Sequence, residues 1–324
     1  MNIAIIGTGA YGLANASILI KNNNSIKMWV ESEEKCEYYK KNRNKLDILP
    51  NIKIPNEIDF SNNYEYVLKD ADIVFIMVAA KYVATVSKEI LKYQTSNMHF
   101  CIGSKGIEQD TCMFVDQVFK KFIKTRNFAV ISGPSFAIDM ARSEPVGLTL
   151  ASKNKKTISV IKKAYGKNTI KLRPSNDILG IEICGSIKNV IALAAGILDG
   201  LGYSESTRSF LITESLHDIK ELIYGLGGRK KTILSYAGVG DLLLTATSTK
   251  SRNYSFGILI GKKDYKAANN YLETNTVEGY YTLKSIYKLL RKKKIKMPVI
   301  DLIYKVIMNN EDPTLLVDFL LNKK

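Results

Sequence analysis

The chain has 324 residues, of which 46% are hydrophobic, and a formal net charge of +16 from 47 basic and 31 acidic residues. A chain of this length can bury a large core and is expected to form two domains. It has four cysteines, no Cys-x-x-Cys pair and two histidines, which argues against a metal site or a disulfide framework.

Targeting and membrane signals are weak in this sequence. A strand-like run begins at Asn2, so we expect no signal or transit peptide before it. We expect no membrane span either, because polar groups interrupt the longest apolar run before it reaches roughly 18 to 20 residues. These features predict a cytoplasmic protein.

A basic run, residues 291–296, reads RKKKIK and is compatible with a nucleic-acid patch. It directly precedes Met297-Pro298, where a helix is expected to end. Because cations are favourable at a helix C-terminus, the run is better explained as a solvated helix end.

Short apolar runs alternate with helical stretches, such as 11–21 and 81–91, through the first half of the chain. This βαβ alternation predicts an α/β domain with a doubly wound parallel sheet over residues 1–177. From residue 178 onward the apolar residues follow a helical period, which predicts an all-α domain over 178–324. The expected strands are 3–6, 26–30, 73–78, 99–102, 128–131, 146–150 and 169–172.

A glycine-rich motif, GTGAYG at residues 7–12, follows the first expected strand and opens a helix. In a dinucleotide fingerprint Gly7 makes the tight turn, Gly9 lets the backbone approach the pyrophosphate, and Gly12 lets helix and strand pack closely. Free amides at the helix N-terminus would hold the anion. A plain glycine-rich turn is the alternative, but the order of strand, motif and helix favours a Rossmann-like domain.

The second expected strand ends in an acidic residue, Glu31. A carboxylate about 20 residues past the glycines accepts hydrogen bonds from ribose hydroxyls and repels a 2′-phosphate. Glu31 lies slightly beyond that distance with no arginine near it, which favours NAD over NADP. The alternative is that Glu31 belongs to a solvated acidic cluster with Glu33 and Glu34.

Lys188 carries a charge inside an apolar run, residues 178–198, that reads ILGIEICGSIKNVIALAAGIL. Burying an ammonium without a partner costs several kcal/mol, roughly, so a carboxylate or ligand is expected beside it. An amine in such a place suits general acid/base chemistry. The alternative is that its stem extends along the edge of a core helix to solvent.

Other polar groups follow the ends of expected elements. Lys105 comes after a strand, at the carboxyl end of the sheet, where ligands bind. Ser135 and Asp241 each stand at a helix start, where capping alone would explain them. The segment 251–253 reads Ser-Arg-Asn, and Arg252 offers a planar fork suited to phosphate or carboxylate.

Together these segments resemble NAD(P)-dependent glycerol-3-phosphate dehydrogenases of the bacterial type. The matching stretches, in the family's order, are GTGAYG, SKGIE, ISGPSFA, GSIKNVIALAAGILDGLG, AGVGDLLLT, SRNYSFG and VEGY. The resemblance implies reversible reduction of dihydroxyacetone phosphate to sn-glycerol 3-phosphate, supplying glycerophospholipid synthesis. It also implies NAD or NADP as the cofactor, and Glu31 favours NADH. The family further suggests a homodimer, and we expect no nucleic-acid partner.

The resemblance further implies roles for individual residues. Lys188 is the catalytic acid/base, Lys105 stabilises the developing alkoxide, and Asp241 holds Lys188; no metal takes part. The implied substrate-binding residues are Lys105, Gly133, Ser135, Lys188, Asp241, Ser251, Arg252 and Asn253. The implied cofactor-binding residues are Gly7, Gly9, Ala10, Tyr11, Gly12, Glu31, Lys105, Ala137, Arg252, Thr276 and Glu278.

Two departures from the family pattern stand out. Residues 78–81 read Val-Ala-Ala-Lys where the family usually shows Val-Pro-Ser, so a loop expected along the cofactor is loosened. Glu31 stands where NADP-using relatives tend to place a basic or neutral residue.

Two other functions are alternatives to a glycerol-3-phosphate dehydrogenase. Another β-hydroxyacid-type dehydrogenase would carry Lys-x-x-x-Asn on its helix, whereas Asn189 directly follows Lys188 here. A redox-sensing, nucleic-acid-binding Rossmann protein would use the basic charge, but the sequence shows no helix-turn-helix or basic-aromatic surface.

Overall fold

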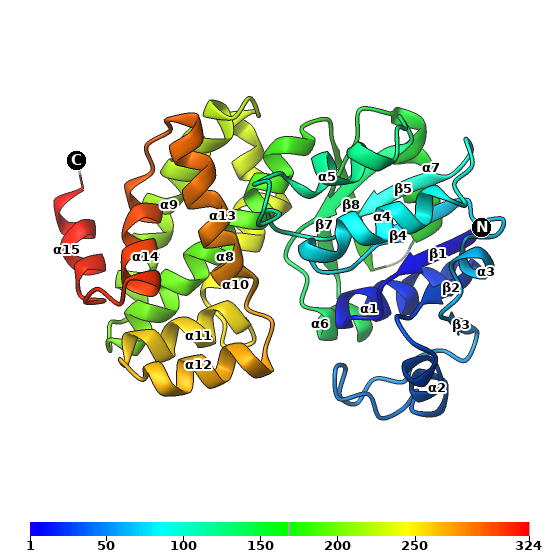
Figure 1. Ribbon diagram of the computed structural model, residues 1–324, viewed down its shortest axis with the longest axis horizontal. Helices are drawn as coiled ribbons and strands as arrows, with labels where there is room; N and C mark the ends of the chain where they lie inside the picture. The colour runs from blue at the N-terminus through cyan, green and yellow to red at the C-terminus, as the bar shows by residue number, and fades with distance from the viewer. Residues whose placement is uncertain (168, 324) are drawn as a thin grey trace. The chain divides into compact units, whose positions relative to one another are not determined.

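The computed structural model describes residues 1–167 and 169–323, which form two compact units (Figure 1). One unit comprises Met1–Lys105 and Val115–Ile178, and the other comprises Gly106–Phe114 and Leu179–Lys324. The division into domains 1–177 and 178–324 stays a prediction, and Asn168 and Lys324 within those ranges lie outside the described residues.

The first unit is built on one eight-stranded sheet with the order β3-β2-β1-β4-β5-β6-β7-β8. Neighbours from β3 to β6 run parallel, whereas β7 pairs antiparallel with β6 and parallel with β8. The doubly wound α/β fold is confirmed, but the last two strands are reversed. The strands are β1 (Asn2–Ile6), β2 (Ser25–Trp29), β3 (Ile58–Ser61), β4 (Ile73–Ile76), β5 (His99–Ile102), β6 (Phe128–Ser132), β7 (Val146–Ala151) and β8 (Ile170–Ser175).

The reversal has a local cause. Parallel neighbours are joined by a crossover connection that usually contains an α-helix. Between β6 and β7 the chain forms only the five-residue helix α6 (Ala137–Ala141). The strand therefore returns antiparallel beside β6.

One strand was missed by the sequence patterns. β3 is a four-residue edge strand whose buried positions, Ile58 and Phe60, alternate with half-buried ones. Such a short alternation between turn-rich segments carries too little periodicity to distinguish it from a loop.

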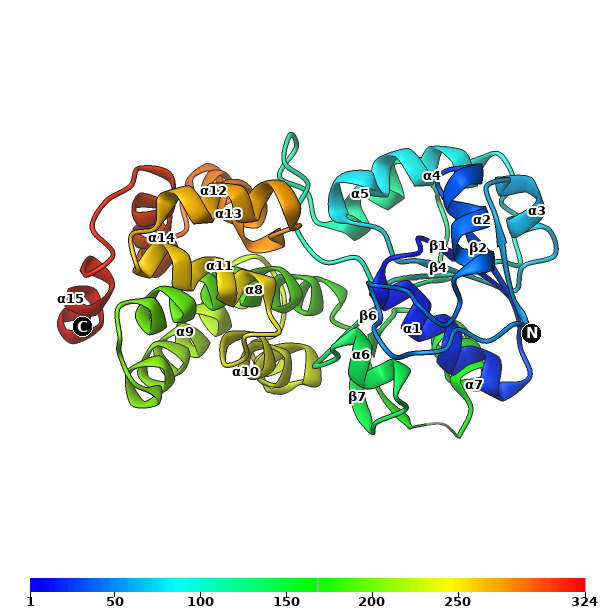
Figure 2. The same cartoon turned by 90° about the horizontal axis from the view of Figure 1, so that it is seen from below.

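Helices cover both faces of this sheet (Figure 2). On one face lie α1 (Ala10–Leu19), α6 and α7 (Lys155–Tyr165), and on the other lie α4 (Val83–Leu91) and α5 (Val115–Phe122). Because both faces are covered, central strands such as β4 are buried at every position, as parallel sheets require. The other helices described in this unit are α2 (Glu33–Lys41), α3 (Tyr64–Leu68), η1 (Ile20–Asn22) and η2 (Ala80–Tyr82).

The second unit is helical, as predicted, and its described residues from 179 onward contain no strand. A short hairpin joins it from the first half of the chain, because Ile107 and Phe114 pair and are buried in its core. The helices are α8 (Ile178–Gly200), α9 (Glu205–Gly225), η3 (Lys230–Leu234), η4 (Tyr236–Gly240), α10 (Asp241–Ala246), α11 (Arg252–Gly261), α12 (Tyr265–Thr274), α13 (Glu278–Lys293), α14 (Pro298–Met308) and α15 (Leu315–Asn322).

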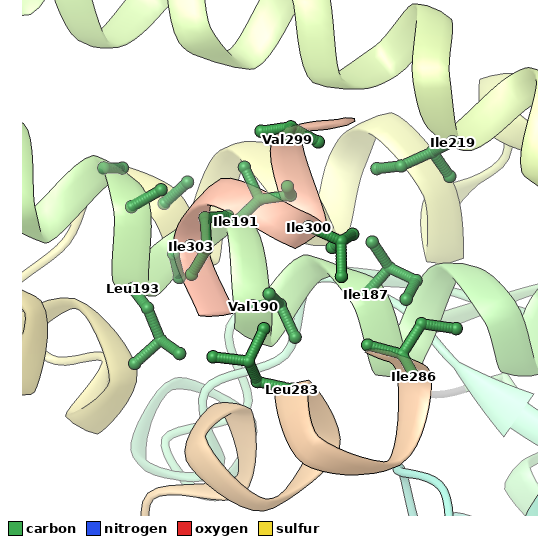
Figure 3. Packing of buried hydrophobic residues seen from close by; sticks show 14 of the residues in the cluster. Ile187, Val190, Ile191, Leu193, Ile219, Leu283, Ile286, Val299, Ile300 and Ile303 are labelled. Carbon is green, nitrogen blue, oxygen red and sulfur yellow. The ribbon is translucent and has the colours of Figure 1, made fainter. Parts of the chain in front are cut away.

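Helix α8 is the centre of this unit. Figure 3 shows Ile187, Val190 and Leu193 of α8 packed among side chains of α13 and α14. The expectation that no apolar segment reaches membrane-spanning length was wrong, because this 23-residue helix is long and apolar enough by composition. However, 94% of its apolar window is buried inside the unit, so the other helices account for its hydrophobicity.

Helices α8 and α11 approach each other until their backbones touch. A Cβ at Gly257 would stand 2.1 Å from the Leu193 carbonyl oxygen, and one at Gly261 would stand 2.2 Å from that of Ile197. In return, a Cβ at Gly196 would stand 2.1 Å from the Tyr254 carbonyl oxygen. Only glycine permits this approach. It sets the beginning of α11 beside the middle of α8.

We expect Gly257→Ala to lower the free energy of unfolding by about 1–3 kcal/mol, because the added methyl forces α8 and α11 apart. Gly225→Ala, in the last turn of α9, is the matched control, since its Cβ would make only an ordinary 3.5 Å contact with Ile295. That control should leave stability within about 1 kcal/mol of the parent. Urea unfolding of the two variants measures the difference, and equal stabilities would contradict the backbone contact.

Candidate active site

The glycine turn after β1 contains glycines that the fold itself requires. Gly7 has a φ of +115°, and its Cβ would stand 2.8 Å from the Met77 carbonyl oxygen. A Cβ at Gly12 would stand 2.3 Å from the Gly7 carbonyl oxygen. These two positions close the turn and pack α1 against β1.

Gly9 is different, because nothing in the described protein requires a glycine there. Its φ of −64° is ordinary, and a Cβ would meet no atom within 4 Å. It precedes α1, whose N-terminus has no side-chain cap, so the amides of Ala10, Tyr11 and Gly12 lie at an uncapped helix start. Space at Gly9 and uncapped amides together fit the pyrophosphate of a dinucleotide.

Lys105 stands at the carboxyl end of β5 and is half-buried. The preceding Ser104 donates a hydrogen bond to the Val78 carbonyl oxygen at 2.5 Å. This bond ties the turn after β5 to the Val-Ala-Ala-Lys segment after β4, which continues into η2. The carboxyl ends of neighbouring strands therefore meet, as expected for a ligand-binding edge.

Ser135 does not cap a helix, so the capping alternative was wrong. The N-cap of α6 is Phe136, and the Ser135 hydroxyl instead donates to the Gly133 carbonyl oxygen at 3.0 Å. Gly133 is required by packing, because a Cβ there would stand 2.7 Å from the Gly147 carbonyl oxygen. Ala137 is the first residue of α6.

Glu31 lies just past the end of β2 and is exposed. It forms an ion pair and hydrogen bond with Lys35, and this bond is the main cause that raises the pKa of Lys35. Glu33 and Glu34 lie in the first turn of α2, which Ser32 caps. The carboxylate of Glu31 is thus held by a specific cation at the tip of the strand.

Lys188 is buried and hydrogen-bonded, so the alternative of a stem extending to solvent was wrong. Its ammonium donates to Asp241 Oδ1 at 2.6 Å and to Thr245 Oγ1 at 3.0 Å. The Lys188 residue is only 8% exposed and Asp241 only 1%. The structure therefore supplies the buried carboxylate that such an ammonium requires.

Asp241 begins α10 but does not cap it; Gly240 is the N-cap. The chain reaches this point through η4, where a Cβ at Gly238 would stand 2.0 Å from the Ile233 carbonyl oxygen. Thr245, one turn further, donates to the Asp241 carbonyl oxygen at 2.7 Å, which turns its lone pairs towards Lys188. Sequence reasoning missed Thr245, although its i+4 spacing from Asp241 places both on one helix face.

The segment 251–253 contains two buried residues that hold helices together and one exposed arginine. Ser251 is the N-cap of α11, and Asn253 donates to Asn189 Oδ1 at 3.1 Å while accepting from the Gly279 amide at 2.8 Å. Only Arg252 of the three is exposed. The amide side chains therefore join α8, α11 and α13, and the guanidinium remains accessible.

Two of the expected cofactor residues lie at the start of α13 in the second unit. Thr276 is exposed two residues before the helix, and Glu278 is the first residue of the helix and half-buried. Within residues 1–167 and 169–323, no three His, Cys, Asp or Glu side chains are grouped closely enough to hold a metal ion.

Family models account for nearly the whole chain. The N-terminal model of NAD-dependent glycerol-3-phosphate dehydrogenase matches residues 2–158, and the C-terminal model matches residues 177–318. The chain belongs to this family. The paired match separates it from the two rival classes considered above.

Individual relatives agree with the family assignment. Glycerol-3-phosphate dehydrogenase [NAD(P)+] of Thermoanaerobacter sp. (strain X514) is 35% identical over 97% of this chain and 94% of its own length. The enzyme of the same name from Bacillus subtilis (strain 168) is 31% identical over 98% and 93%. The crystal structure of glycerol-3-phosphate dehydrogenase from Coxiella burnetii superimposes with a TM-score of 0.92 at 28% identity, covering 99% of this chain and 98% of that one.

We expect Gly9→Ala to weaken dinucleotide binding by tenfold or more while changing the free energy of unfolding by less than about 1 kcal/mol. The methyl would occupy space that the protein leaves empty. Gly12→Ala is the contrast, because its methyl would strike the Gly7 carbonyl and destabilise the fold. Calorimetric titration and thermal unfolding measure the two effects; unchanged affinity in a folded Gly9→Ala protein would contradict the assignment.

Proposed function

We propose that this protein catalyses the reversible reduction of dihydroxyacetone phosphate to sn-glycerol 3-phosphate with NADH or NADPH. The protein is an oxidoreductase of its family, and the relatives named above carry this activity in their names. The observation that carries the proposal is the buried Lys188–Asp241–Thr245 cluster, which has the chemistry of a proton donor held in place.

The first unit would hold the cofactor. The amides at the start of α1 and the space at Gly9 fit the pyrophosphate. Glu31, just past the end of β2, would accept hydrogen bonds from the ribose hydroxyls. When bound, the reduced cofactor supplies the hydride. We assign further cofactor contacts to Ala137, Lys105, Arg252, Thr276 and Glu278.

Lys188 would donate a proton to the carbonyl oxygen of the substrate as negative charge develops there. Asp241 would hold the amine in place, and Thr245 would restrict its position from a second side. General acid assistance of this kind contributes about 10² to 10⁴ to the rate. Lys105 would stabilise the same oxygen electrostatically.

Arg252 would bind the phosphate of the substrate, because it is accessible and presents a bidentate fork. Ser251 and Asn253 would support it by fixing the first turn of α11, and Gly133 and Ser135 complete the proposed substrate residues. Binding energy from the phosphate then orients the reacting carbon.

We infer a preference for NADH from Glu31, a homodimer from the family resemblance, a cytoplasmic location, and a role in supplying glycerophospholipid synthesis. The burial of α8 supports the location, since its apolar surface is used inside the unit.

We expect Lys188→Ala to lower kcat/KM by about 10² to 10⁴, because the proton donor is lost. Binding of the cofactor should survive, since the glycine turn is untouched. Lys323→Ala is the matched control, because that lysine of the same unit is likewise ion-paired, in its case with Glu214 and Asp218. Cofactor oxidation with dihydroxyacetone phosphate measures turnover, and an active Lys188→Ala enzyme would refute the role.

We expect the KM for NADH to be lower than that for NADPH, because the Glu31 carboxylate repels a 2′-phosphate. Glu31→Gln should narrow the difference, whereas Glu33→Gln, an exposed neighbour in the first turn of α2, should not. Steady-state kinetics with each cofactor decides the matter. A preference of the parent enzyme for NADPH, or equal effects of the two substitutions, would reject a role for Glu31.

A further inference from the structure

The phenolic oxygen of Tyr11 is buried and has no hydrogen-bond partner in the part of the chain that the structure describes. The ring is held tightly, because a Cβ at Gly103 would stand 3.0 Å from its Cε1. A buried hydroxyl without a partner destabilises the protein that carries it. The position therefore calls for an explanation other than stability.

The polar groups nearest to Tyr11 are engaged elsewhere. Asn15 donates to the backbone carbonyl of Tyr11 at 2.7 Å and accepts from the Tyr165 hydroxyl at 2.5 Å. The Ser135 hydroxyl donates to the Gly133 carbonyl oxygen. Both side chains lie close enough to lower the pKa of Tyr11, but each is committed to the bonds above, and neither forms a hydrogen bond of normal geometry with the phenolic oxygen.

Lys105 brings a positive charge close to this oxygen. It lies two residues beyond Gly103, whose backbone packs on the Tyr11 ring. Burial raises the pKa of Tyr11 overall, and among the opposing causes the charge of Lys105 is the largest. The phenol is thus neutral at neutral pH, and its oxygen can accept a hydrogen bond from an ammonium.

We propose that Tyr11 is a positioning residue for Lys105, whose ammonium donates to the Tyr11 phenolic oxygen in the substrate complex and is thereby directed at the substrate carbonyl. The inference rests on the proposed function, since it concerns how Lys105 meets the substrate. The Tyr11 hydroxyl then acts on the substrate through Lys105, whereas the Tyr11 backbone amide contacts the cofactor.

Tyr11→Phe tests the proposal because it removes only the hydroxyl. We expect kcat/KM for dihydroxyacetone phosphate to fall about tenfold, as for loss of a hydrogen bond to a charged group, with the Kd of the cofactor unchanged. The melting temperature should stay the same or rise, because an unpartnered buried group has been removed. Unchanged kcat/KM, or a loss confined to cofactor affinity, would overturn the proposal.

Tyr165→Phe is the matched control. It is the same chemical change at a neighbouring buried phenol that does have a partner, Asn15. The melting temperature should fall while kcat/KM stays within about twofold. A purely structural Tyr11 hydroxyl would behave like Tyr165 and lower the melting temperature of Tyr11→Phe.

A double-mutant cycle with Lys105→Met shows whether Tyr11 acts through Lys105. If it does, Tyr11→Phe should change kcat/KM by less than twofold in the Lys105→Met background. Additive losses would reject the coupling. If the parent enzyme does not reduce dihydroxyacetone phosphate, the proposed function is wrong. If the parent is active and Tyr11→Phe has the same kcat/KM, only the role of Tyr11 is rejected.

Discussion

The buried ion pair between Lys188 and Asp241 is the interaction on which the second unit is organised. Two opposite charges taken out of water are tolerated only with close geometry and further hydrogen bonds. Here the ammonium meets both Asp241 and Thr245, and Thr245 is oriented by its own bond to the Asp241 carbonyl. The close turn at Gly238 leads into α10, which begins at Asp241. A buried ion pair is weak evidence for stability, which is consistent with the role of proton donor proposed for Lys188.

The two units place their functional groups by different means. In the sheet unit the proposed ligand groups belong to the backbone. The turn closed by Gly7 and Gly12 leaves uncapped amides at the start of α1 and free space at Gly9. In the helical unit the proposed ligand groups are side chains. Glycine contacts between α8 and α11 set the distance between these two helices. Asn253 then bonds both Asn189 and the start of α13, so three helices meet at one amide.

Polar groups in this protein differ in whether the fold itself completes their hydrogen bonds. Ser251, Asn253 and Tyr165 have their hydrogen bonds completed within the fold, so their loss is expected to appear first as lost stability. Arg252 is exposed, and the hydroxyl of Tyr11 is buried without a partner. Such groups lower stability or add nothing to it, which is consistent with the ligand contacts proposed for them.

Periodicity and turn chemistry in the sequence determined the α/β unit, the helical unit and the glycine turn, because these depend on local spacing. The pattern around Lys188 also indicated that the lysine needed a carboxylate. Tertiary structure alone decided which groups met it: Thr245 lies 57 residues away along the chain, and no local pattern records that separation. It also decided the reversal of β7, the edge strand β3 and the burial of α8, since each depends on what packs alongside. Local spacing and turn chemistry specify helices and strands, whereas packing determines which residues far apart in the sequence come into contact.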